Sequence, residues 1–157
     1  GSVAAALNSA SEASVTSGSN VAVADGKAEV TVVSVYRSDD ETIDGATKRY
    51  MPYVQISLAG AENARSLDFK VVNTGESNVE FTVRLVDKDG KAYNAGSAFI
   101  KAGGNRDVHI NLDATVFTED IMKNIVAVRL AFANVNDEGT ALAANRSFTV
   151  SDMRFYK

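Results

Sequence analysis

The stretch SLDFKVVNTGESNVEFTVRLVDKDGKAY, residues 66–93, decides the fold, because apolar and polar side chains alternate along most of it. Successive side chains of a β-strand point to opposite faces, so this period of two predicts strands over 66–72 and 79–86, each with one face on a core. The expected core positions are Leu67, Phe69, Val71, Phe81, Val83 and Leu85. The turn residues NTGESN between the two runs and DKDG after them predict tight antiparallel connections.

From Asn20 onward, the chain repeats this pattern of short alternating runs separated by turn residues. Asp25-Gly26 marks a hairpin because both positions tolerate positive φ, and Thr118 can cap a single helical turn over 119–124. Turn signals every 8–12 residues or so are typical of sandwiches and barrels. We therefore expect an all-β fold: a two-sheet antiparallel β-sandwich or jelly roll with at most one short helical turn.

Two later strands predict where particular side chains point. In RSFTVSDMRFYK the apolar positions change parity between residues 150 and 153. A β-bulge at Ser151–Asp152 would keep all of them in the core and turn Asp152 in an unusual direction. In IVAVRLAFAN the alternation predicts one core-facing set. Its members are Val126, Val128, Leu130 and Phe132.

The length of 157 residues suits one domain with a sizeable core. Residues 1–19 are predicted to be an expression scar, Gly1-Ser2, followed by an Ala/Ser-rich linker or flexible tail that has room for a short strand at 13–16. Residues 20–157 are predicted to form a single β-sandwich domain.

Composition excludes several classes of function. The net charge of −4 argues against a nucleic-acid binder, which normally carries a basic patch. No apolar run approaches the roughly 18–20 residues that cross a bilayer. With no cysteine and one histidine, the chain has no disulfide, no thiolate nucleophile and no zinc cage of Cys and His.

Signatures of catalysis are weak. The single histidine, His109, lies in mid-strand facing away from the core, and no G-x-S-x-G turn accompanies it. DKDG lacks the remaining positions of an EF-hand loop, so a hairpin turn explains it better. A glycosidase needs two carboxylates about 5–9.5 Å apart across a cleft, and only the loop 37–47 is long enough to help build one. We expect a protein that is not an enzyme; a deep pocket gathering two carboxylates would favour a small enzyme instead.

A family resemblance runs through residues 65–157. The order SLDFKVVNTG, VEFTVRLVDKDGK, DVHINL, IVAVRLAFAN and FTVSDMRFYK resembles bacterial carbohydrate-binding modules of the β-jelly-roll type. These galactose-binding-like sandwiches are appended to secreted glycoside hydrolases and polysaccharide lyases. The resemblance therefore implies a non-catalytic, extracellular or cell-surface module that targets a covalently linked enzyme to a polysaccharide. The alternative is a structural or adhesive spacer, or a protein-binding module of a cell-surface protein, which an exposed apolar patch or an open edge strand would favour.

The chain departs from the family pattern in two respects. Family members often stack Trp on sugar rings, and this sequence has no Trp. Many members also hold a structural calcium between an N-terminal acidic residue and the C-terminal Asp. Those positions correspond here to Glu12, as a weak partner, and Asp152. No other cofactor is implied.

The candidate binding surface consists of the polar alternates, which combine hydrogen-bonding groups for sugar hydroxyls with aromatic rings for the apolar faces of sugars. If the strands pair as the pattern implies, these residues line one sheet; the alternative is that some of them lie on the outer side of the opposite sheet. They are Tyr53, Gln55, Lys70, Thr82, Arg84, His109 and Arg129, with Tyr93 near a strand end. The competing interpretation is a solvated face whose members pair with Asp68, Glu80 or Asp107. A cationic face without Trp suits an acidic or non-crystalline polysaccharide better than crystalline cellulose.

Overall fold

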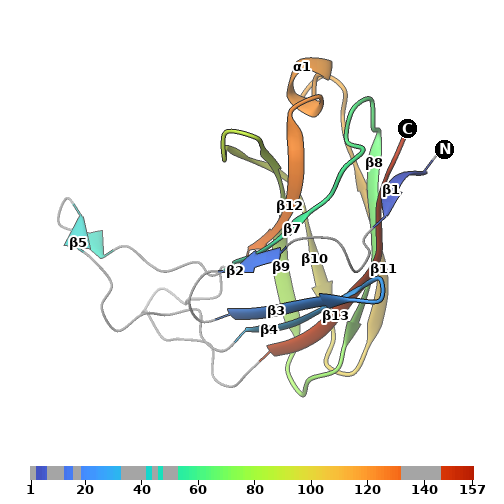
Figure 1. Ribbon diagram of the computed structural model, residues 1–157. Helices are drawn as coiled ribbons and strands as arrows, with labels where there is room; N and C mark the ends of the chain where they lie inside the picture. The colour runs from blue at the N-terminus through green and yellow to red at the C-terminus, as the bar shows by residue number, and fades with distance from the viewer. Residues whose placement is uncertain are drawn as a thin grey trace.

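The computed structural model describes residues 3–6, 13–15, 19–32, 42–43, 46–47, 53–131 and 146–157, and Figure 1 shows them chiefly as two layers of strands. The elements are β1 (Val3–Ala6), β2 (Ala13–Val15), β3 (Ser19–Ala24), β4 (Lys27–Val32), β5 (Thr42–Ile43), β6 (Ala46–Thr47), β7 (Tyr53–Ser57), β8 (Ser66–Asn73), β9 (Val79–Asp87), β10 (Ala92–Ile100), β11 (Asn105–Asn111), α1 (Glu119–Met122), β12 (Ile125–Ala131) and β13 (Arg146–Tyr156). Within these ranges α1 is the one helix, and no helix there is long and apolar enough to cross a membrane.

Two antiparallel sheets form the layers. Sheet A has the strand order β11-β8-β13-β4-β3, with β1 also paired to β13. Sheet B has the order β10-β9-β12-β7-β2. Strands β5 and β6 pair with each other in a separate two-stranded sheet. The all-β sandwich predicted from the sequence is confirmed.

The core lies between the sheets and is built from the alternating apolar positions of both. Every core position predicted in the stretch 66–93 is buried. Strand β8 contributes them to sheet A and β9 to sheet B, so the two runs face each other across the core. Phe81 joins the layers: its ring centroid lies 6.2 Å from that of Phe69 and 5.8 Å from that of Phe148, and both pairs are stacked. Burying such a side chain contributes roughly 1.5–3 kcal/mol.

The turns adopt the conformations that their residues favour. Asp25 and Gly26 have φ of 53° and 77°, as a two-residue hairpin between β3 and β4 requires. After β9, the Asp87 carboxylate accepts hydrogen bonds from the backbone N–H groups of Asp89 and Lys91, each at 2.9 Å. DKDG is therefore a hairpin turn, as predicted.

The predicted helical turn and the predicted bulge are both present. Thr118 caps α1, and its hydroxyl accepts from the N–H of Ile121 at 3.4 Å. The pairing of β13 with β8 shifts register between Ser151 and Arg154. The four apolar side chains of β13 are buried on both sides of the shift, while Asp152 is exposed with a φ of 54°. The bulge therefore keeps the core continuous and turns Asp152 outward.

One core assignment in β12 was wrong. A register shift between Ile125 and Ala127 buries Ile125 and leaves Val126 48% exposed. Because both residues are apolar, the alternation could not show which of them faces the core. Val128 and Leu130 are buried as predicted, and Phe132 lies outside the described residues.

Strands β1 and β2 lie within the segment predicted to be a scar and linker or tail. Val3 and Ala6 pair with Tyr156 and Arg154, and β2 pairs with β7. The short strand expected at 13–16 is thus present as β2, whereas β1 was not expected. The division of the chain at residue 19 stays a prediction.

Candidate functional site

The structure divides the predicted binding residues between the two sheets. Lys70 on β8 and His109 on β11 belong to sheet A, whereas Arg84 on β9 and Arg129 on β12 belong to sheet B. Outward side chains of the two sheets point away from each other, because the core lies between the sheets. The prediction that these four cations share one face is therefore wrong, and each sheet must be considered by itself.

Sheet B carries most of the predicted set. Arg84 pairs with Arg129 across strands, Arg129 pairs with Gln55, and Arg84 pairs with Asn94 on its other side. In the next row, Ala131 on β12 pairs with Thr82 of β9 on one side and with Tyr53 of β7 on the other. We call this surface the sheet B polar face. Its members are Tyr53, Gln55, Thr82, Arg84, Asn94 and Arg129.

Arg129 is held from two sides. Its Nε and Nη2 donate hydrogen bonds to Oε1 of Gln55 at 3.0 and 2.9 Å. Its guanidinium carbon lies 4.1 Å from the centroid of the Tyr53 ring, a cation–π contact. Tyr53 and Gln55 can act together because they are two residues apart on β7 and so point to the same face. Arg129 is thereby fixed in one orientation before any ligand binds.

Arg84 is held less completely. The side chain is half-buried, and its Nε is shielded from solvent without a hydrogen-bond partner among the residues that the structure describes. Among the described residues, neither Arg84 nor Arg129 has a carboxylate within ion-pair distance. Cross-strand neighbours have Cβ atoms about 4.5–5.5 Å apart, and like charges in such positions destabilise a sheet.

A small apolar floor surrounds the two arginines. Two residues along the strands from the Arg84–Arg129 pair, Val86 on β9 pairs with Ala127 on β12. Two residues from Arg129 in the other direction along β12 lies Ala131. All three are buried although they do not belong to the core between the sheets. The two arginines are thus flanked in the sheet by buried apolar residues.

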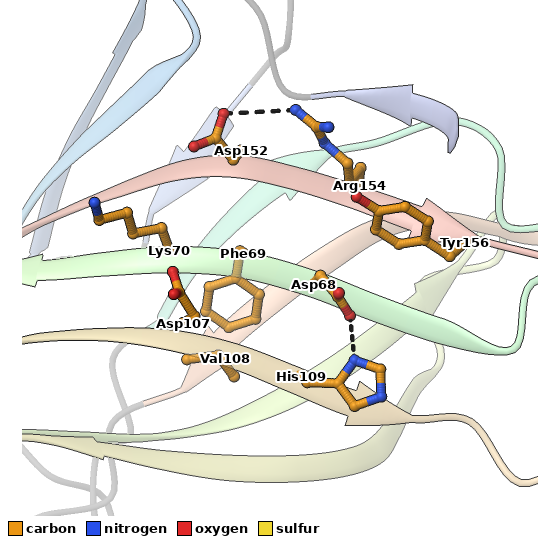
Figure 2. A pocket seen from close by; sticks show the side chains of 9 residues that line it. All are labelled: Asp68, Phe69, Lys70, Asp107, Val108, His109, Asp152, Arg154 and Tyr156. Carbon is orange, nitrogen blue, oxygen red and sulfur yellow. Dashed lines mark hydrogen bonds and ion pairs between the residues drawn. The ribbon is translucent and has the colours of Figure 1, made fainter. Parts of the chain in front are cut away.

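Sheet A carries a hollow of about 470 Å³ on its outer surface, shown in Figure 2. It is lined by Asp68, Phe69, Lys70, Asp107, Val108, His109, Asp152, Arg154 and Tyr156. His109 Nδ1 lies 2.6 Å from Asp68 Oδ1, and its Nε2 lies 2.9 Å from Asn111 Oδ1. The hydrogen bond to Asn111, then the hydrogen bond and charge of Asp68, raise the pKa of His109 above its ordinary value.

The charges in this hollow are largely matched by one another. Arg154 Nη2 lies 3.5 Å from Asp152 Oδ1, and Lys70 stands directly opposite Asp107 in the register of β8 and β11. Nε of Arg154 is buried and has no hydrogen-bond partner in the described part of the chain. The pairing of His109 with Asp68 is one that the solvated-face interpretation anticipated. The hollow thus contains internal ion pairs rather than uncompensated charge.

The metal prediction gains no support from the residues described. Calcium takes about 6–8 oxygen ligands, whereas Asp152 contacts the Arg154 guanidinium. No group of three or more potential metal ligands occurs in the described part of the chain. Glu12 lies outside that part, so its pairing with Asp152 stays a prediction.

Tyr93 does not belong to the sheet B polar face. It pairs with the buried Leu85 and packs against the edge of the core. Its hydroxyl lies 3.5 Å from Asp87 Oδ2, and the ammonium of Lys91 lies 4.9 Å from its ring centroid. The tyrosine supports the end of the β9–β10 hairpin.

Asn94 is the member of the polar face that sequence reasoning missed. The predicted turn at 87–90 could have revealed it. Pairing the residues of the two strands outward from that turn places Asn94 opposite Arg84. Arg154 was also missed as part of the hollow on sheet A. Its position beside Asp68 depends on the bulge in β13, and the parity change in the sequence gave the only sign of it.

Comparison by sequence finds no match: no protein-family model and no curated protein matches the chain. Comparison with solved structures finds clear matches. An agarase aligns at a TM-score of 0.62 and 11% identity over 93% of this chain, which spans only 24% of the agarase. A variant of a family 29 carbohydrate-binding module, solved with mannohexaose, aligns at 0.56 and 8% identity over 98% of this chain and 90% of the module. The family 11 carbohydrate-binding module of a cellulosomal cellulase from Clostridium thermocellum aligns at 0.50 and 12% identity, covering 93% and 86% of the two chains.

At such identities the likeness is one of fold. The chain has the β-sandwich fold of these carbohydrate-binding modules, and it corresponds to most of the length of each module. It spans about a quarter of the agarase.

Proposed function

We propose that this chain is a non-catalytic carbohydrate-binding module that binds an acidic or non-crystalline polysaccharide on the sheet B polar face. Attached to an exported bacterial glycoside hydrolase or polysaccharide lyase, it would raise the local concentration of the enzyme on its substrate. The shared fold with modules from families 29 and 11 supports this proposal, as does the correspondence in length. Fold alone does not assign function, so the argument depends on the site.

The arrangement of Arg129 carries the proposal. Its guanidinium is tied to Gln55, stacked on Tyr53 and placed in one row with Arg84 and Asn94. Such a row offers planar hydrogen-bonding groups along the width of the sheet, with Arg129 held in place, which suits the hydroxyl and ring oxygens of a glycan chain. Because Arg129 covers one face of the Tyr53 ring, the tyrosine serves first to hold the arginine.

The other interpretations have less support. In the described residues the exposed large apolar side chains are Phe99, Val116 and Val126, which lie on three different segments, so a protein-binding spacer has no obvious apolar surface.

The hollow on sheet A does gather carboxylates, which would favour an enzyme. However, the side chains of Asp68 and Asp152 are 38% and 69% exposed and already face cations, whereas a carboxylic acid kept protonated for catalysis is typically buried in an apolar site.

Affinity electrophoresis against neutral and acidic plant and algal polysaccharides tests the proposal. The wild-type protein should be retarded by at least one of them, and Arg129→Gln should lose most of that retardation. Lys70→Gln removes the same charge from the opposite sheet and should bind like wild type. Retardation by none of the polysaccharides would reject carbohydrate binding. Loss in Lys70→Gln without loss in Arg129→Gln would move the site to sheet A.

A further inference from the structure

We propose that Arg84 and Arg129 together bind one anionic substituent of the glycan, either a carboxylate or a sulfate ester. This inference rests on the proposed function and specifies the chemical group that the sheet B polar face recognises. It concerns a subsite of two residues from β9 and β12, which are direct neighbours in the sheet.

The first argument is uncompensated charge. Arg84 and Arg129 are direct cross-strand neighbours on one face, and among the described residues no carboxylate pairs with either of them. The acceptor that holds Arg129 is the neutral amide of Gln55, which orients the guanidinium without cancelling its charge. Along β9, the acidic residue on the same face is Glu80, four positions from Arg84, or about 13 Å at the usual rise of a strand.

The second argument is that N–H donors of both arginines have no acceptor among the described residues. An arginine has five N–H donors, and Gln55 accepts two of those of Arg129, so three remain. Among the described residues, the buried Nε of Arg84 has no hydrogen-bond acceptor. A buried donor without a partner is destabilising, so an acceptor supplied by a ligand is favoured there. An oxyanion between the two groups would supply acceptor oxygens to both and relieve their mutual repulsion.

The contrast with sheet A makes the assignment specific. There the cations have acidic neighbours: His109 has Asp68, Arg154 has Asp152, and Lys70 stands opposite Asp107. The whole chain carries a net charge of −4, so a general attraction of polyanions to the protein is not expected. Recognition of an acidic glycan must therefore come from a local cationic subsite, and the Arg84–Arg129 pair provides one.

The test compares charged glycans with their own neutral forms. Calorimetry would measure binding to a uronic-acid polymer and its carboxyl-reduced form, and to a sulfated galactan and its desulfated form. We expect at least one charged polymer to bind at least 10-fold more tightly than its neutral form. The pair that shows the difference identifies the substituent as a carboxylate or a sulfate ester. The preference should weaken as salt rises, because salt screens the charge.

Variants then assign the preference to the two arginines. Arg84→Gln should weaken binding of the charged polymer about 10- to 100-fold, the range for losing a hydrogen bond to a charged group, and should weaken binding of the neutral form much less, so that the charge preference is lost. Arg84→Lys should retain part of the affinity, because a point charge lacks the planar fork. Lys101→Gln, a charge removal at an exposed turn, is the matched control and should bind like wild type.

Thermal unfolding of Arg84→Gln shows whether the variant is folded. Its midpoint should equal or exceed that of wild type, because one of two adjacent like charges is gone. Equal binding of charged and neutral polymers would overturn the anion subsite while leaving carbohydrate binding intact. The same conclusion would follow if folded Arg84→Gln and Arg84→Lys both kept the charge preference. Absence of binding to every polymer would instead reject the proposed function.

Discussion

Replacing Gln55 with alanine should reduce ligand affinity by releasing Arg129, although Gln55 need not touch the ligand. The Gln55 amide oxygen accepts hydrogen bonds at 3.0 and 2.9 Å from two nitrogens of the same guanidinium. Without them, Arg129 keeps only its contact with Tyr53 and regains side-chain freedom. Ordering such a side chain again on binding costs about 0.5–1.5 kcal/mol, which corresponds to roughly 2- to 12-fold weaker binding.

The same change should lower stability modestly. Two hydrogen bonds to a half-buried charged group contribute about 1 kcal/mol together, which for a domain of this size lowers the melting temperature by about 2–4 °C. Gln55→Glu keeps the acceptor and should preserve the melting temperature, but its negative charge should weaken binding of an acidic glycan. Asn105→Ala, at an exposed amide on sheet A, is the matched control.

A double-mutant cycle measured by calorimetry separates positioning from direct contact. If Gln55 acts only through Arg129, Gln55→Ala should have no further effect on affinity once Arg129→Gln is present. Additive losses would refute this reasoning, because they would mean that Gln55 contacts the ligand independently. Unchanged affinity in Gln55→Ala alone would show that Arg129 needs no support.

Two further predictions concern stability. Asn73 is 1% exposed, donates to the carbonyls of Ser77 and Ile100 at 2.8 and 3.1 Å and accepts from Gly75 N–H at 3.0 Å. Asn73→Ala should therefore destabilise the protein by about 2–4 kcal/mol in urea denaturation, because several buried polar groups lose their partner; a loss below about 0.5 kcal/mol would contradict this. The pKa of His109 is raised in the folded state, so its contribution is fully present below the unfolded pKa of about 6.5 and is lost as pH rises through the folded pKa. Melting temperatures from pH 5.5 to 8.5 should show a small loss with rising pH, worth less than about 1 kcal/mol, that His109→Gln lacks; an identical pH profile in the variant would show that the pairing contributes nothing.

The elements and turns of this fold could be predicted from the sequence because their causes are local. Alternation placed the core positions of β8 and β9, positive-φ residues placed the hairpin at Asp25-Gly26, and the parity change placed the bulge before Met153. Among the predicted core positions that the structure describes, the exception at Val126 arose where two apolar residues are adjacent and either can face the core.

The composition of the site could be predicted only in part. Alternation showed correctly that Lys70, Arg84, His109 and Arg129 point away from the core, but not in which layer each lies. Strands β8 and β9 follow each other in sequence and nevertheless belong to opposite sheets. A five-residue connection such as 74–78 can either turn back within a sheet or cross to the other one, and the alternation is the same in both cases.

By itself, then, the sequence determined an all-β chain, the side of each strand that meets the core, and the residue types available for binding, since each of these follows from steric preferences over a few residues. The tertiary structure decided which of those residues are neighbours. Arg84 and Arg129 are 45 positions apart, and Gln55 is 74 from Arg129. They meet because β9, β12 and β7 pair in one sheet, and that pairing depends on how the whole core packs rather than on any local pattern.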